Sequence, residues 1–163
     1  WLTLGKWASY RRDHAAAARA FWEATQRDSY ALDAWTGLSA ELNQLALAEI
    51  QVTPVVMTAI EHRIELLKRL RQTKQRFIKS RSISRALANE IASTLVDLGR
   101  LWEAEAWLAT AATLPEDPNV DIASARQDVV SRLSRETPWQ MQLGHPELLL
   151  DLSHLPLPAT VPR

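Results

Sequence analysis

Apolar residues recur at intervals of three and four along most of this chain, with polar residues between them. On an α-helix this spacing places the apolar side chains on one face, which is then buried against a neighbouring element. Runs that alternate with the period of a β-strand are scarce, so we predict an all-α protein. The expected helices cover residues 1–11, 14–27, 30–50 and 54–79, a stretch that ends at Gly99, residues 101–111, and a stretch from Asp117-Pro118 to just before Pro138.

Local signals mark where several of these helices begin and end. Thr53-Pro54 is a start signal, because a hydroxyl group caps the helix and proline is tolerated at its first position. No helix breaker follows until about Ser80, so this helix is expected to run for about 26 residues and roughly 39 Å. Asp28-Ser29 is predicted to cap the helix over 30–50, and Gly99 is a suitable terminator.

A second pattern repeats with a longer period. The motif W-x-x-L-G at residues 1–5 is followed after 34 residues by W-x-x-L-S at residues 35–39. Small and aromatic residues lie between the two copies, at Ala17, Phe21 and Ala24. A period of 34 residues is typical of stacked helix–turn–helix repeats.

This spacing resembles the tetratricopeptide repeat, which places Trp, Leu, Gly, Ala, an aromatic residue and Ala at such intervals. The chain departs from the family at Ala8, where an aromatic residue is usual, and at Ser29, where the closing proline is absent. In the second unit the long helix from Pro54 replaces the second helix of the pair. A third unit fits again through Ile91, Ala92, Leu95, Gly99, Ala104, Leu108 and Ala111.

The resemblance implies antiparallel helix pairs stacked as a right-handed solenoid, with one extended helix and the last helix as an end cap. It covers residues 1–135, which we predict to be the domain; an irregular helical bundle is the alternative. Prolines at 138, 146, 156, 158 and 162 then indicate a tail over 136–163 that either drapes over the helices or leads elsewhere. Trp139 is the expected anchor of this tail. Because the chain begins inside the repeat pattern, we expect it to be part of a larger protein or assembly.

Solenoids of this family bind other protein chains in a concave groove lined by the first helix of each pair. The resemblance therefore implies a protein–protein interaction or scaffold module whose partner is a peptide segment or a subunit of a complex. A solvated face with no partner is the alternative for each groove position. The outward positions of the first helices are Lys6, Tyr10, Asn43, Gln44, Asn89 and Asp97.

Charge adds a second hypothesis. The chain has no net charge, yet residues 63–85 hold nine basic residues and one acidic residue, a local net charge of +8. A basic helix of this kind attracts nucleic acid or an anionic membrane. Alternatively, it is paired with acidic neighbours such as Glu103, Glu105, Glu116 and Asp117, or packs on an acidic subunit. The candidate residues are Lys68, Arg69, Arg71, Lys74, Arg76 and Lys79.

Residues suited to catalysis are sparse. The chain has no Cys, and its four His residues lack the spacing of a helical zinc site. Asp151-x-Ser153-His154 holds the residue types of a catalytic triad, but closeness in sequence does not supply the geometry. We therefore expect a protein that is not an enzyme and uses neither cofactor nor metal. No apolar run is long enough to span a membrane, and the compartment stays open.

Overall fold

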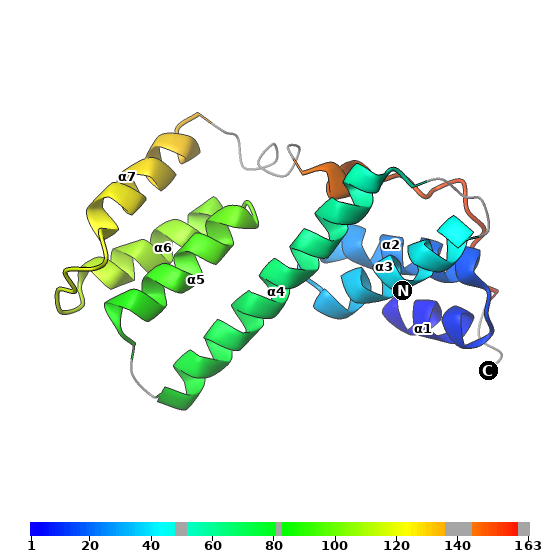
Figure 1. The fold of residues 1–163 in the computed structure, drawn as a ribbon, viewed down its shortest axis with the longest axis horizontal. Helices are drawn as coiled ribbons and strands as arrows, with labels where there is room; N and C mark the ends of the chain where they lie inside the picture. The colour runs from blue at the N-terminus through cyan, green and yellow to red at the C-terminus, as the bar shows by residue number, and fades with distance from the viewer. Residues whose placement is uncertain (48–51, 81–82, 136–144, 160–163) are drawn as a thin grey trace. The chain divides into compact units, whose positions relative to one another are not determined.

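The computed structural model describes residues 1–47, 52–80, 83–135 and 145–159. Within these ranges the chain is helical and contains no strand, which confirms the predicted all-α class (Figure 1). The helices are α1 (Leu2–Tyr10), α2 (His14–Arg27), α3 (Leu32–Leu47), α4 (Pro54–Ser80), α5 (Arg85–Asp97), α6 (Leu101–Ala112), α7 (Ile122–Leu133) and the 3₁₀-helix η1 (Pro146–Leu149).

The chain divides into two compact units. Unit 1 comprises Trp1–Glu65 and His145–Arg163, and unit 2 comprises Leu66–Gly144. Helix α4 therefore begins in unit 1 and ends in unit 2, and the residues described after position 144 belong with unit 1. The expected division between residues 135 and 136 stays a prediction, since 136–144 lie outside the described ranges.

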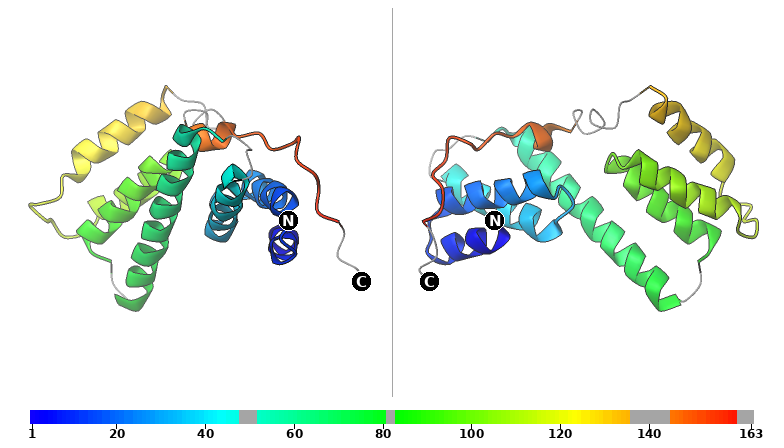
Figure 2. Two further views of the ribbon diagram at one scale, coloured as in Figure 1. Left: turned by 45° about the vertical axis from the view of Figure 1, so that its right-hand side comes forward. Right: turned by 180° about the vertical axis from the view of Figure 1, so that it is seen from behind.

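Close packing in unit 1 depends on two glycines around one aromatic ring. Helix α2 packs against both α1 and α3, as two further views show (Figure 2). The Phe21 ring of α2 is 3% exposed and meets Gly5 of α1 and Gly37 of α3. A Cβ atom at Gly5 or Gly37 would stand 2.8 or 2.6 Å from this ring, closer than real contacts allow. The absence of a side chain at both positions thus lets three helices meet.

The α1–α2 and α5–α6 helix pairs have the same type of turn. In the first, Arg12 has a φ of 61° and the Asp13 amide donates to the Ala8 carbonyl at 3.0 Å. In the second, Gly99 has a φ of 77° and the Arg100 amide donates to the Leu95 carbonyl at 2.8 Å. Both are Schellman-type helix ends, in which a left-handed residue reverses the chain. Gly99 thus ends its helix as predicted.

The two helix pairs also bury residues at matching positions. Positions are counted here from the left-handed residue of each turn, Arg12 or Gly99. In both pairs the residue four positions before it is buried, and so are the residues five, nine and twelve positions after it. These residues are Ala8, Ala17, Phe21 and Ala24 in unit 1, and Leu95, Ala104, Leu108 and Ala111 in unit 2. Alanine occupies the positions five and twelve after the left-handed residue in both sets, so the paired helices approach closely.

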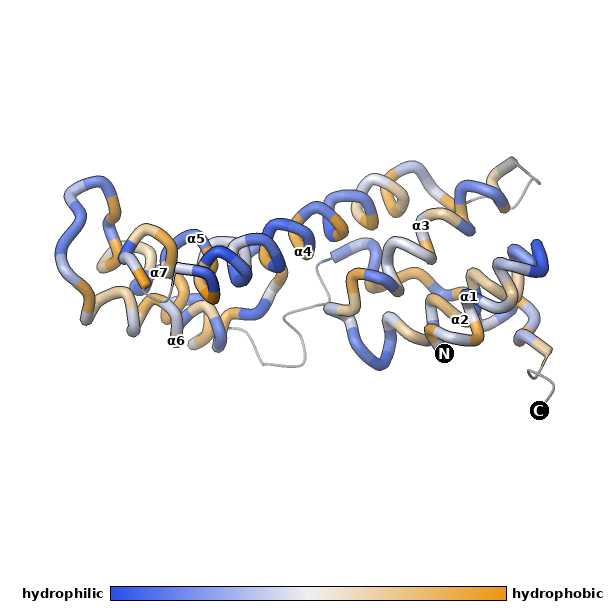
Figure 3. The backbone as a smooth tube through the Cα atoms, turned by 90° about the horizontal axis from the view of Figure 1, so that it is seen from below, coloured by the Kyte–Doolittle hydropathy of each residue, from blue (hydrophilic) through white to orange (hydrophobic). Residues whose placement is uncertain are grey.

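Unit 2 is built on α6, which packs against both α5 and α7. The second half of α4 joins it through Phe77, whose ring meets the Trp107 ring edge to face with centroids 5.8 Å apart. The Thr73 hydroxyl donates to Glu90 of α5 at 3.0 Å. Hydrophilic residues otherwise dominate this part of α4 (Figure 3).

Two predicted helix starts are wrong, and one is confirmed. Asp28 accepts a hydrogen bond from the Tyr30 amide in a local turn, and α3 begins only at Leu32. Asp117 likewise closes a turn onto Asn119, and the cap of α7 is Asp121. The reason is that an Asp side chain satisfies the amide two residues ahead as readily as a helix end. Thr53 caps α4 as expected, since its hydroxyl accepts from the Val56 amide at 3.4 Å.

The left-handed Arg12 gives a direct test of this turn. A residue with a Cβ atom is strained at positive φ, so Arg12→Gly is expected to stabilise the chain by about 1 kcal/mol. Gly99→Ala is the matched control and should destabilise by a similar amount. Urea unfolding of both variants, together with hydrogen exchange at the Asp13 amide, measures the effect. A lower midpoint for Arg12→Gly would contradict the assigned turn.

Candidate functional site

Residues 145–157, named here the C-terminal segment, lie against α2 within unit 1. Trp22 Nε1 donates to the Leu150 carbonyl at 2.7 Å, and Arg19 Nη1 donates to the Leu152 carbonyl at 2.8 Å. The two donors are three residues apart on α2 and therefore share one face of that helix. The course of the segment can be followed from orange to red in Figure 2. One helix face thus holds the backbone of another part of the chain.

A buried ion pair fixes the start of the segment. Arg63 of α4 and Glu147 of η1 are 1% and 3% exposed, and Arg63 Nη1 lies 3.1 Å from Glu147 Oε1. Arg63 Nε also donates to the Ser29 carbonyl at 3.2 Å. The guanidinium lies 5.3 and 5.6 Å from the ring centroids of Trp35 and Tyr30. Arg63 thus joins η1, α4 and the entry to α3.

The hydrogen bonding of the arginines in this site is incomplete. Arg63 Nη2 and Arg19 Nε are buried and have no hydrogen-bond partner among the described residues. A buried donor left unpaired costs about 1–3 kcal/mol. The Arg63–Glu147 pair is therefore bound by one hydrogen bond where a guanidinium and a carboxylate can form two.

Opposing effects act on the Glu147 carboxyl. Burial disfavours its charged form, but hydrogen bonds from His145, from its own backbone amide and from Arg63 favour it, as does the charge of Arg63. The net result is that the pKa of Glu147 lies below its usual value of 4.5. The ion pair is therefore charged at neutral pH, and acid weakens it.

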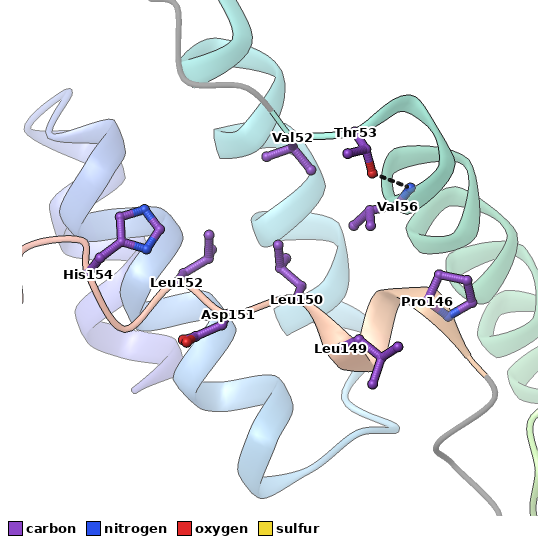
Figure 4. A pocket seen from close by; sticks show the side chains of 9 residues that line it. All are labelled: Val52, Thr53, Val56, Pro146, Leu149, Leu150, Asp151, Leu152 and His154. Atoms are coloured by element: carbon purple, nitrogen blue, oxygen red, sulfur yellow. Dashed lines mark hydrogen bonds between the residues drawn. The ribbon is translucent and has the colours of Figure 1, made fainter.

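An open cavity of about 340 Å³ lies beside the segment (Figure 4). Apolar side chains from the start of α4 and from the segment form most of its wall. Figure 4 shows Leu150 and Leu152 both pointing toward the stretch that carries Val52. The lining residues are Val52, Thr53, Val56, Pro146, Leu149, Leu150, Asp151, Leu152 and His154.

The six predicted groove residues are divided between the two units. Lys6 and Tyr10 on α1 and Asn43 and Gln44 on α3 are exposed in unit 1, and Lys6 lies 3.8 Å from Asp33. In unit 2, Asn89 is half-buried and Asp97 is exposed on α5. A single groove containing all six stays a prediction. The predicted anchor Trp139 lies outside the described residues.

The predicted basic residues lie on the second half of α4. Five of the six, Lys68, Arg69, Arg71, Arg76 and Lys79, are exposed, and Lys74 is half-buried. Arg76 pairs with Glu90 at 3.0 Å. Among the described residues, no ion pair to Arg69, Arg71, Lys74 or Lys79 is formed. This part of α4 therefore presents cations to solvent.

The acidic partners expected for this helix are wrong in two cases. Glu103 pairs with Arg100 beside it, and Glu105 pairs with Arg126 of α7 at 2.7 Å. The cations that bind these two carboxylates lie outside α4, on Arg100 and Arg126. Two further cations of the basic stretch are engaged internally, since Arg63 is buried with Glu147 and Arg85 donates to the Leu114 carbonyl.

The sequence contains one indication of this site, the position of Arg63, that the sequence analysis did not use. Arg63 lies three residues after Ile60 and four before Leu67, so it falls in the apolar stripe of α4. A charged residue in such a stripe must be paired if it is buried. Its partner was not evident, because Glu147 is 84 residues away in sequence.

Comparison of the chain with protein-family models, curated proteins and solved structures finds no match. None of the helices in the described ranges is long and apolar enough to cross a membrane. The described residues also include no group of three or more His, Asp or Glu side chains placed to hold a metal ion.

The sequence Asp151-x-Ser153-His154, which holds the residue types of a catalytic triad, forms a local turn. Asp151 accepts a hydrogen bond from the Ser153 amide at 2.8 Å, which closes this turn.

The buried ion pair predicts a specific dependence of stability on pH. A carboxyl whose pKa is lowered by folding stabilises the folded state above its unfolded pKa, and this contribution is lost as the pH falls through the folded pKa. Glu147→Gln should cost about 3 kcal/mol at pH 7, because Arg63 is left without its anion. The difference in unfolding free energy between wild type and Glu147→Gln should shrink between about pH 5 and pH 3.

Urea unfolding followed by tryptophan fluorescence measures this difference. The pKa values of Glu23 and Asp151 are also lowered, by the hydrogen bond from Arg27 and by those from Ser153 respectively. Both groups are present in the two proteins, so their effects cancel. A constant difference across this pH range would show that the charge of Glu147 does not stabilise the fold.

Proposed function

We propose that this chain is a protein-binding module built from tetratricopeptide-like helix pairs, without catalytic activity. The shared turn of α1–α2 and α5–α6 and their matching buried positions support this assignment. In this proposal the pairs belong to a right-handed solenoid that α4 interrupts. The module is part of a larger protein or assembly, and its partners are peptide segments or subunits of other chains.

One observation carries the proposal. Unit 1 binds an extended stretch of polypeptide through side-chain donors, Trp22 and Arg19, that engage main-chain carbonyls. Recognition of backbone groups with side-chain pockets between them is a general mode of peptide binding. A surface that holds a segment of its own chain in this way has the chemistry to hold a segment of another chain.

A peptide selection tests this function. The full chain is presented to a displayed library of random peptides, and enriched peptides are measured by fluorescence anisotropy. We expect a shared sequence pattern and dissociation constants in the range of about 1–100 µM, as for a small interface. The urea-unfolded chain is the control. Equal enrichment on folded and unfolded protein, or no shared pattern, would contradict the proposal.

A second candidate function rests on α4. The exposed cations Arg69, Arg71 and Lys79 lack ion-pair partners in the described ranges and share a stretch with a net charge of +8. Such a surface attracts RNA or an anionic membrane by releasing counterions. Aromatic side chains that stack on bases are not interleaved with the cations of residues 68–76. This candidate therefore ranks below protein binding.

Titration against single-stranded RNA and anionic vesicles at several salt concentrations tests the second candidate. It predicts binding that weakens with salt, and on RNA a salt slope that falls by about 0.7 for each phosphate that the variant no longer neutralises. The test variant replaces Lys68, Arg69, Arg71, Lys74 and Arg76 with Gln. The control replaces as many cations elsewhere, namely Lys6, Arg11, Arg12, Arg27 and Arg135. Wild-type protein that shows no salt-dependent binding rules this function out.

A further inference from the structure

Unit 1 holds the backbone of residues 150–152, the part of the C-terminal segment between η1 and a turn, as a binding protein holds an extended peptide. The Leu150 and Leu152 carbonyls accept hydrogen bonds from Trp22 and Arg19. Every residue type supplies a main-chain carbonyl, so this part of the contact is independent of the side chains of the bound segment. It fixes the direction and position of an extended chain on α2.

Selectivity comes from three side chains of the segment. The Glu147 carboxylate meets Arg63, and Leu152 and Leu155 are buried at 2% and 8% exposure. These positions define the spacing Glu-x4-Leu-x2-Leu. The segment carries two acidic residues and no Lys or Arg, and the surface beneath it supplies the cation Arg63. Arg19 also lies beneath the segment but is paired with Glu23 at 2.7 Å, so the match in charge rests on Arg63 and Glu147.

The fit of the segment to this surface leaves room for a better ligand. Arg63 Nη2 is buried without a hydrogen-bond partner among the described residues, although a carboxylate bound to both nitrogens would satisfy it. The open cavity of about 340 Å³ also borders Leu149 and Leu150 (Figure 4). A segment with a bidentate carboxylate and a bulkier side chain near position 150 would use both features.

We propose that residues 145–157 occupy a peptide site of unit 1 in cis, and that a segment of another protein displaces them. The ligand is a peptide with a carboxylate and leucines at the spacing of Glu147, Leu152 and Leu155. It is extended at the positions of residues 150–152, with a 3₁₀ turn before them and a turn after them, as in the C-terminal segment. This inference rests on the proposed protein-binding function and specifies its site, its ligand chemistry and its regulation. A tethered segment acts at an effective concentration of about 1 mM, so a free peptide binds well only when the contact in cis is weakened.

A direct test uses a fluorescein-labelled peptide of residues 145–157 and the full chain. The variant Glu147→Ala/Leu152→Ala weakens the contact in cis and leaves unchanged the residues of α2 and α4 that contact the segment. We expect it to bind the peptide at least about tenfold more tightly than wild type does, because competition from the tethered segment is removed. Leu157→Ala is the matched control, since Leu157 is 60% exposed, and it should bind as weakly as wild type.

Further changes check the individual contacts. In the Glu147→Ala/Leu152→Ala chain, Trp22→Phe removes the donor to the Leu150 carbonyl and should weaken peptide binding. A peptide with Gln at the position of Glu147 should bind less tightly, since it lacks the charge that Arg63 meets. A peptide with Phe at the position of Leu150 should bind more tightly, because it fills the cavity.

Two outcomes of the binding test would overturn the inference, and a third comes from the peptide library. One is a Glu147→Ala/Leu152→Ala chain that keeps the helical circular dichroism of wild type and does not bind the peptide. The other is disappearance of that helical signal, since the segment would then be a permanent part of the core. Library peptides that bind the folded chain but lack the Glu-x4-Leu-x2-Leu spacing would leave the proposed function standing and refute only this site.

Discussion

Unit 1 depends on the need to neutralise Arg63. This guanidinium is placed within the apolar stripe of α4, where an unpaired charge is not tolerated, and Glu147 supplies the anion. The Ser29 carbonyl and the rings of Trp35 and Tyr30 complete its surroundings. Because these groups come from three separate parts of the chain, one side chain ties η1, α4 and the entry to α3 together.

Small residues provide the second constraint, which is steric. Gly5 and Gly37 leave space for the Phe21 ring, and alanines on α2 and α6 bring paired helices close together. The left-handed turns at Arg12 and Gly99 then reverse the chain with the same hydrogen bonds. Similar helix pairs thus arise in both units from different sequences, because the positions that need a small residue or a left-handed turn are the same.

The arginines that hold the C-terminal segment and the cations at the end of α4 differ in their surroundings. Arg63 and Arg19 use their charges inside unit 1, on a carboxylate and on a main-chain carbonyl. Most cations at the end of α4 face solvent, and Arg76 pairs there with Glu90 at the surface. Charge interactions of the buried arginines are strong and depend on the exact positions of the partner atoms, because water is excluded around them. Those of the cations on α4 are screened by solvent and salt, so they depend mainly on the total charge of a partner.

The sequence by itself determined the helices, because each buries a stripe whose period is local and whose ends carry short-range signals such as Thr53-Pro54 and Gly99. It also showed the small residues that helix pairs require. It misplaced the starts of α3 and α7, where Asp28 and Asp117 close turns in place of capping helices. The place of the C-terminal segment was decided only by tertiary structure. Arg63 and Glu147 are 84 residues apart, and no local rule relates two residues that only the folded chain brings within 3.1 Å.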